Sequence, residues 1–177
     1  MRRISISAAF ALCMGLGASG AQAAVQPCVT SDEASVLMLV LAPEAIRAAG
    51  TLCSRSLPST ALLRQTNSSL LARYQAEADA AWPQARSAIG KIGGLDATGL
   101  GDSELMRPLL TAMVLPAITG ELKPRDCAAV DHIVTLLAPL PPRNAADLVV
   151  AFMQLGNADK ASRNEEQAFP ICPAARP

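Results

Sequence analysis

The apolar side chains between Leu70 and Ile89 recur at every third or fourth position, and this periodicity constrains the fold more than any other feature. Such spacing places them on one face of a long α-helix. We find no sustained alternation of apolar and polar residues of the kind that marks a β-strand, and aromatic residues make up 3% of the sequence. Alanine, leucine, arginine and glutamate dominate instead, and all four favour helices. The sequence therefore predicts an all-α protein.

Helix start and stop signals divide the chain into about six helices. A capping box at Thr30–Glu33 begins the first helix. Pro43 is expected to break that helix and to begin a short second one over residues 43–49. Gly50 then serves as a left-handed stop. A further short segment follows over residues 60–66, so the first third of the chain is predicted to consist of short pieces.

The middle of the chain is predicted to hold two longer helices. The first starts near Ser68 and is kinked at Pro83, because the proline ring clashes with the preceding turn. Glycines near residues 90–101 form a flexible joint after it. Asp102 then caps the next helix, which ends at Gly120. Together with the preceding segments, these helices predict an irregular bundle kinked at Pro43 and Pro83.

Two helices and a tail complete the prediction. Pro124 opens a helix that runs through Leu137, and Asn144 caps a final amphipathic helix that Gly156 ends. The rest, residues 157–177, is a polar C-terminal tail. Its segment 169–173 contains a phenylalanine, an isoleucine and a cysteine between prolines, and we expect it to return to the body of the protein.

The first 23 residues have the three parts of a secretory signal peptide. Met1–Arg3 is a short basic start, Ile4–Leu16 is an apolar run, and Ala21–Ala23 is a small-x-small cleavage site. The apolar run is too short to cross a bilayer, which takes roughly 20 residues. We therefore expect residues 1–23 to be cleaved and the protein to be periplasmic or secreted. Residues 24–177 are then expected to form a single helical domain of ordinary size.

The charge balance excludes several classes of partner. The chain has 15 basic and 15 acidic residues, and loss of Arg2 and Arg3 with the leader leaves a net charge of −2. A chain so close to neutral lacks the clustered basic surface that binds nucleic acid or an anionic membrane. The helix predicted over residues 105–118 is apolar around nearly all of its circumference, but it is short for a membrane span. We expect no nucleic acid as a partner and no membrane anchor.

The four cysteines beyond the leader are expected to form two disulfides, which an oxidising compartment favours. They are Cys28, Cys53, Cys127 and Cys172, and none of them is spaced as C-x-x-C. That spacing is what a zinc ribbon or a redox motif needs, so we expect no metal and no cofactor. Of the three possible pairings, the expected break at Pro43 favours Cys28–Cys53 together with Cys127–Cys172. A continuous helix would instead hold Cys28 and Cys53 far apart.

His132 is the only histidine, and hence the only ready general base near neutral pH. A metal site on a helix would need a second ligand three or four residues away, and those positions hold three apolar residues and a threonine. Asp131 points about 100° away around the helix. A surface or half-buried position is the favoured interpretation of His132. A hydrolase that uses His132 is the weakest of three functional hypotheses.

Four further residues are weak candidates for contacts with a partner. Met106, Met113 and Met153 have adaptable side chains of the kind that line grooves for partner helices or apolar ligands. Trp82, beside the expected kink, is a candidate contact surface. Packing in the core explains these side chains at least as well as binding does.

Since the sequence contains no concentrated polar constellation, the favoured hypothesis is a non-catalytic interaction or structural module of the bacterial cell envelope. This hypothesis leaves open which envelope protein is the partner. The alternative is a carrier of a small apolar ligand in a cavity between helices. A cavity of sufficient size would favour the carrier, and a densely packed core would exclude it.

Overall fold

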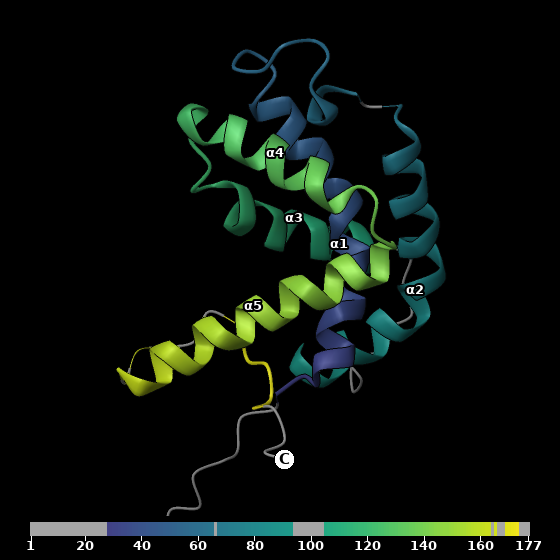
Figure 1. The fold of residues 1–177 in the computed structure, drawn as a ribbon. Helices are drawn as coiled ribbons and strands as arrows, with labels where there is room; N and C mark the ends of the chain where they lie inside the picture. The colour runs from purple at the N-terminus through teal and green to yellow at the C-terminus, as the bar shows by residue number, and fades with distance from the viewer. Residues whose placement is uncertain (1–27, 66, 94–104, 164, 166–168, 174–177) are drawn as a thin grey trace, which may run out of the picture.

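The computed structural model describes residues 28–65, 67–93, 105–163, 165 and 169–173. Within these ranges the protein is all-α, with five α-helices rather than about six, and two 3₁₀ turns (Figure 1). The elements are α1 (Ser31–Leu52), η1 (Leu62–Arg64), α2 (Ser69–Gly93), α3 (Met106–Thr119), η4 (Pro124–Asp126), α4 (Cys127–Leu137) and α5 (Pro142–Ser162). The described residues form no β-strand.

Helix α1 begins at the predicted capping box and runs unbroken through Pro43. The side chain of Thr30 accepts a hydrogen bond from the amide of Glu33, and the Glu33 carboxylate accepts one from the amide of Thr30. The predicted break at Pro43 and the separate helix over 43–49 are wrong. A proline costs a helix interior about 3 kcal/mol. Pro43 is fully buried, and the packing of α1 in the core offsets that cost.

Gly50 lies inside α1 and does not act as the predicted left-handed stop. A Cβ atom placed on Gly50 would lie 2.1 Å from the carbonyl oxygen of Leu63 in η1. No other residue type would fit at this distance without a shift of the backbone. Gly50 therefore serves a close approach between two segments, and the helix ends two residues later at Leu52, with Cys53 as its C-cap.

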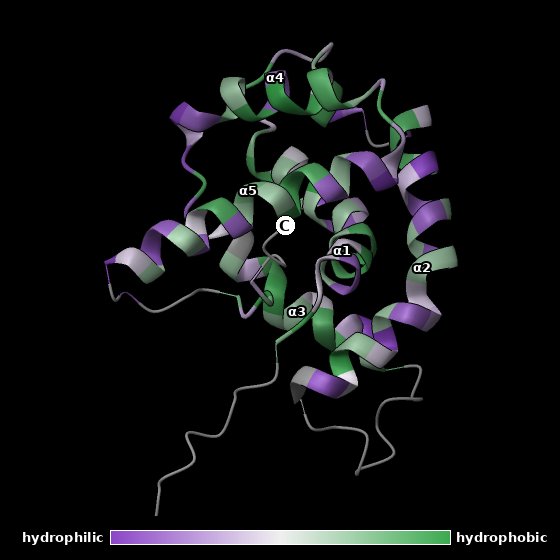
Figure 2. Ribbon diagram, turned by 60° about the horizontal axis from the view of Figure 1, so that its bottom comes forward, coloured by the Kyte–Doolittle hydropathy of each residue, from purple (hydrophilic) through white to green (hydrophobic). Residues whose placement is uncertain are grey.

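Helix α2 continues through Pro83 and through Gly90, and it ends at Gly93. The first four residues of the glycine-rich joint expected over 90–101 are therefore helical, and residues 94–104 lie outside the described part of the chain. Figures 1 and 2 show α2 bending around α1. A proline inside a helix is a recognised cause of such a bend.

The boundaries of the last three helices differ from the prediction at the caps. The expected cap of α3, Asp102, lies outside the described residues, and α3 begins at Met106. Helix α4 follows a 3₁₀ turn that starts at the predicted Pro124. Helix α5 begins at Pro142 rather than after Asn144, because proline at the first helical position needs no amide partner.

Helix α5 also passes the predicted stop at Gly156 and ends at Ser162. A Cβ atom on Gly156 would meet no other atom within 4 Å, so no tertiary contact requires glycine there. An ion pair between Asp159 and Arg163 supports the last turn. The first part of the segment predicted as a tail is therefore helical.

Helix α1 is the central element, and α2, α3 and α5 pack against it (Figure 2). Its side chains Leu39 and Val40 are among the most completely buried in the protein. Among the described helices, α1 has the length and apolar composition of a membrane-spanning segment, a property that core helices share. Half of the residues in its apolar stretch are buried inside the molecule.

The two disulfides are present, but the predicted pairing is wrong. Cys28 is bonded to Cys172, and Cys53 is bonded to Cys127. The reason is the unbroken α1, because 22 helical residues hold Cys28 and Cys53 about 33 Å apart. Each cysteine therefore pairs with a residue from the C-terminal half of the chain.

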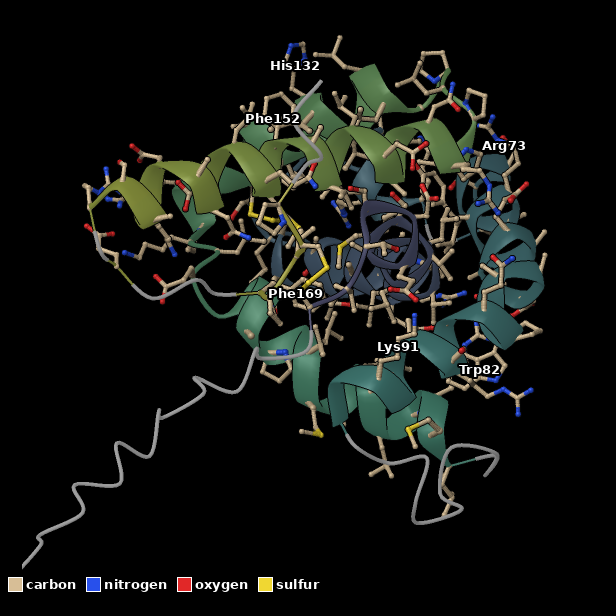
Figure 3. All side chains as sticks on the ribbon, turned by 90° about the horizontal axis from the view of Figure 1, so that it is seen from below. Arg73, Trp82, Lys91, His132, Phe152 and Phe169 are labelled. Atoms are coloured by element: carbon tan, nitrogen blue, oxygen red, sulfur yellow. A yellow bond between two sulfur atoms is a disulfide. The ribbon has the colours of Figure 1, made fainter. Side chains whose placement is uncertain are left out.

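The segment 169–173 returns to the body, as expected. The amide of Val29 donates a hydrogen bond to the carbonyl of Pro170, and the amide of Cys172 donates one to the carbonyl of Val29. Val29 and Ile171 are both buried and form an isolated parallel bridge. Phe169 packs against the core beside the start of α1 (Figure 3).

Candidate functional site

An apolar cavity of about 220 Å³ lies among α1, α2, α4 and α5. Among its lining residues, Tyr74 is the one whose side chain carries a hydroxyl group. The lining residues are Met38, Leu41, Ala42, Ala45, Ile46, Leu70, Tyr74, Val134, Leu137, Ala145, Ala146 and Val149. An apolar cavity of about 150 Å³ binds benzene, so this one has room for about nine non-hydrogen atoms.

Alanines open the space between the helices. Ala42 and Ala45 lie on the face of α1 that lines the cavity, and Ala145 and Ala146 contribute the first turns of α5. Their side chains end at Cβ and leave unfilled the volume that a leucine or a valine would occupy. Protein interiors normally contain few voids larger than a water molecule. A cavity of this size therefore distinguishes this part of the core from the rest.

Tyr74 supplies the polar feature of the cavity. Tyr74 is 7% exposed and belongs to an apolar cluster with Leu70 and Ala145. Burial raises the pKa of the Tyr74 hydroxyl, and the positive charge of Arg73 acts in the opposite direction. The hydroxyl is therefore neutral at physiological pH and can both donate and accept a hydrogen bond. Within the described residues, no hydrogen bond engages it.

Two polar contacts hold the wall that α4 contributes. The guanidinium of Arg73 on α2 donates a hydrogen bond to the carbonyl of Ala138, just after α4. On the other side, the carboxylate of Asp131 accepts a hydrogen bond from the amide of Leu63, at 2.9 Å. These contacts fix α4 relative to α2 and η1, so the cavity does not depend on apolar packing alone.

The cavity reaches the surface beside α5. Val149 lines it and is 39% exposed. Neighbouring side chains on α5 and α4 are also apolar and exposed; they are Leu148, Phe152, Ile133 and Leu136. Figure 3 shows Phe152 pointing away from the body of the protein, on the same side as His132. An apolar molecule approaching this side would meet apolar side chains before it reaches the cavity.

A second, wider hollow lies between α1 and α3 and has a volume of about 630 Å³. Its charged groups already have partners within the protein, because Glu44 pairs with Arg47 and Arg107 pairs with Asp79. The hydroxyls of its threonines donate to carbonyls of their own helix. This hollow is more open than the apolar cavity and offers a ligand few free polar groups.

His132 lies exposed on α4 and lines neither hollow. Its side chain makes no hydrogen bond or ion pair with another described residue. The preceding Asp131 uses its carboxylate to accept the amide of Leu63 and does not turn toward His132. The described residues therefore give His132 no serine or carboxylate with which to form a catalytic pair.

Of the other predicted contact residues, Met106 and Trp82 pack in the same core cluster, whereas Met113 and Met153 lie elsewhere. Trp82 is half-buried on α2, and the guanidinium of Arg107 lies 5.8 Å from the centre of its ring. Met106 is buried in the main core. Met153, which lies on α5, packs beside Val29. Met113 is 78% exposed on α3. These side chains form no common groove.

The described residues contain no group of three histidine, cysteine, aspartate or glutamate side chains that could hold a metal ion. No family model, no curated protein and no solved structure matches this chain. The sequence did not identify the cavity residues as a site, because each of them has the pattern of an ordinary core residue. The one available signal was the single tyrosine, Tyr74, within an apolar helical stripe.

Proposed function

We propose that this protein binds a small apolar molecule in the cavity among α1, α2, α4 and α5. One observation carries the proposal: a cavity of about 220 Å³ whose lining residues are all apolar apart from Tyr74. The volume lies below the 300–1,000 Å³ of most ligand pockets. The ligand is therefore a compact molecule, such as a single ring with short substituents or a short alkyl chain.

We further infer that binding takes place outside the cytoplasm. The basic start, apolar run and small-x-small site of residues 1–23 support export with cleavage. The two disulfides are consistent with an oxidising compartment such as the periplasm or the medium. A carrier in such a compartment would hold an apolar molecule away from water.

Calorimetric titration of the oxidised protein with 4-ethyltoluene, an apolar probe of about nine non-hydrogen atoms, tests the proposal. The variant Ala45→Leu adds three carbon atoms to the lining and should weaken binding about tenfold or more. The matched control is Ala48→Leu, since Ala48 is also half-buried on α1 but does not line the cavity. Absence of binding by the wild type, or equal loss in both variants, would contradict the proposal.

An interaction module of the bacterial cell envelope is the second candidate function. Its support is the exposed apolar side chains of α3, α4 and α5, among them Met113 and Phe152, which are 78% and 65% exposed. Large exposed apolar patches often mark a protein contact. Native mass spectrometry of protein purified gently from its own cells tests this candidate: a bound polypeptide would favour it, and a small added mass would favour the carrier.

A further inference from the structure

The hydroxyl of Tyr74 is an unpaired polar group in apolar surroundings. The residue is more than nine-tenths buried. The cluster around it consists of apolar side chains, and most of these also line the cavity. The hydroxyl is not among the fully enclosed side-chain atoms that lack a partner, so a small molecule can reach it. A phenylalanine would fill nearly the same space without offering a hydrogen bond.

We infer that Tyr74 is the specificity-determining residue of the cavity and selects ligands with one oxygen-containing group on a compact hydrocarbon body. This inference rests on the proposed function. The remaining lining side chains are apolar, so they bind the hydrocarbon body without distinguishing it from other hydrocarbons. The hydroxyl adds one directional contact, which an alcohol, a phenol or a carbonyl can complete and a pure hydrocarbon cannot.

The size of the cavity limits the class further. Room for about nine non-hydrogen atoms excludes long-chain lipids as fully enclosed ligands. No charged side chain lines the cavity, so a carboxylate or an ammonium group would be buried without a counterion. The ligand class is therefore neutral, small and singly oxygenated, as in a short-chain alkylphenol or a medium-chain alcohol or ketone.

The test is a double-mutant cycle with two probes of the same shape. The probes are 4-ethylphenol and 4-ethyltoluene, which differ by a hydroxyl in place of a methyl group. Both are titrated into the wild type and into Tyr74→Phe, with folding of the variant checked by circular dichroism. The ratio of the two affinities should be about fivefold more favourable to the phenol in the wild type than in the variant, which is the effect of one hydrogen bond.

The cycle separates two kinds of failure. Equal affinity ratios in both proteins would overturn the role of Tyr74 and leave apolar binding in place. Absence of binding of either probe would overturn the cavity as a ligand site, and this inference with it.

A second measurement does not depend on the variant. Tyr74 is the only tyrosine of the chain, so the tyrosine bands in ultraviolet resonance Raman spectra of the wild type report the hydrogen bonding of this one hydroxyl. The bands should change on addition of 1-hexanol and stay constant with heptane, which carries a methyl group in place of the hydroxyl and, like the alcohol, contributes no phenol bands of its own. The same response to both probes would also overturn the inference.

Discussion

At the scale of single residues, Gly50 shows how a tertiary contact fixes a residue type. It lies within α1, where glycine is unfavourable by about 1 kcal/mol relative to alanine. The carbonyl oxygen of Leu63 occupies the position that a side chain would need, 2.1 Å from the ideal Cβ atom. Gly156 in α5 has the same helical setting and no such neighbour. The two glycines therefore separate the effect of packing from that of helix propensity.

We expect Gly50→Ala and Gly156→Ala to change stability in opposite directions. The first forces η1 away from α1, and such overpacking costs about 1–3 kcal/mol. The second gains about 0.5–1 kcal/mol, because alanine is the better helix former and meets open space. Urea unfolding of both variants under oxidising conditions measures the difference. A gain of stability in Gly50→Ala would show that the close approach is absent in solution.

The sequence could not identify the role of Gly50, because its pattern fits a helix cap equally well. What distinguishes the two roles is the position of Leu63, which depends on how η1 folds back. Tyr74 is a similar case. The stripe from Leu70 to Ile89 predicts correctly that it is buried, while its place beside a cavity depends on three other helices.

At the scale of elements, an ion pair joins the start of α1 to the end of α2. The ammonium group of Lys91 donates to the carboxylate of Glu33, which also completes the capping box of α1. Figure 3 shows Lys91 on α2 beside the beginning of α1. The hydrogen bond from Lys91 and that from the Thr30 amide lower the pKa of Glu33. The contact is partly exposed, so its contribution to stability is modest.

A charged Glu33 should therefore stabilise the protein at neutral pH and lose this effect in acid. Its ordinary pKa is 4.5, and the folded value is lower, so the stabilisation is complete above the ordinary value and is lost as the pH falls through the folded one. Glu33→Gln keeps a capping side chain and removes the charge. It should lower stability by about 0.5 kcal/mol at neutral pH, and the difference should shrink as the pH falls below 4.5.

Thermal unfolding across this range of pH measures the effect of Glu33→Gln. In a Lys91→Met background the substitution should cost less, because the positive partner is gone. A difference that stays constant with pH would indicate that the cap, and not the charge, is responsible.

Helix identity was predictable from the sequence, and helix continuity was not. Capping at Thr30, the periodic stripe of α2 and the start near Pro124 follow from local rules, and the structure confirms them. Pro43 violates the local rule, because burial on several sides of α1 outweighs a missing amide. Neighbouring helices decide such cases, so a single sequence without their positions gives the wrong answer.

At the scale of the whole molecule, the continuity of α1 determines the disulfide pattern. Its two ends lie far apart, and each is bonded to a different part of the C-terminal half. Cys28–Cys172 closes a separation of 144 residues and Cys53–Cys127 one of 74. Loops of these lengths correspond to about 4–5 kcal/mol of stabilisation each in the chain-entropy account. The two bonds differ in exposure, since Cys53 and Cys127 are buried while Cys28 and Cys172 are partly exposed.

Peptide mapping without reductant should recover the pairs Cys28–Cys172 and Cys53–Cys127. On titration with a mild thiol, the partly exposed Cys28–Cys172 bond should open first, because attack on a disulfide requires access. Mass spectrometry after alkylation of the freed thiols follows the order. A Cys28–Cys53 peptide would contradict the continuous α1, and earlier opening of Cys53–Cys127 would contradict its burial.

The clasp between Val29 and the segment 169–173 also constrains when the protein can mature. Its two sides are separated by nearly the whole described chain, so it cannot close until Cys172 has emerged from the machinery that makes or moves the chain. Until then Val29 and Cys28 have no partner at the start of α1. Completion of the fold thus waits for Cys172, and a chain interrupted before residue 169 would leave an unpaired thiol by which quality control could recognise it.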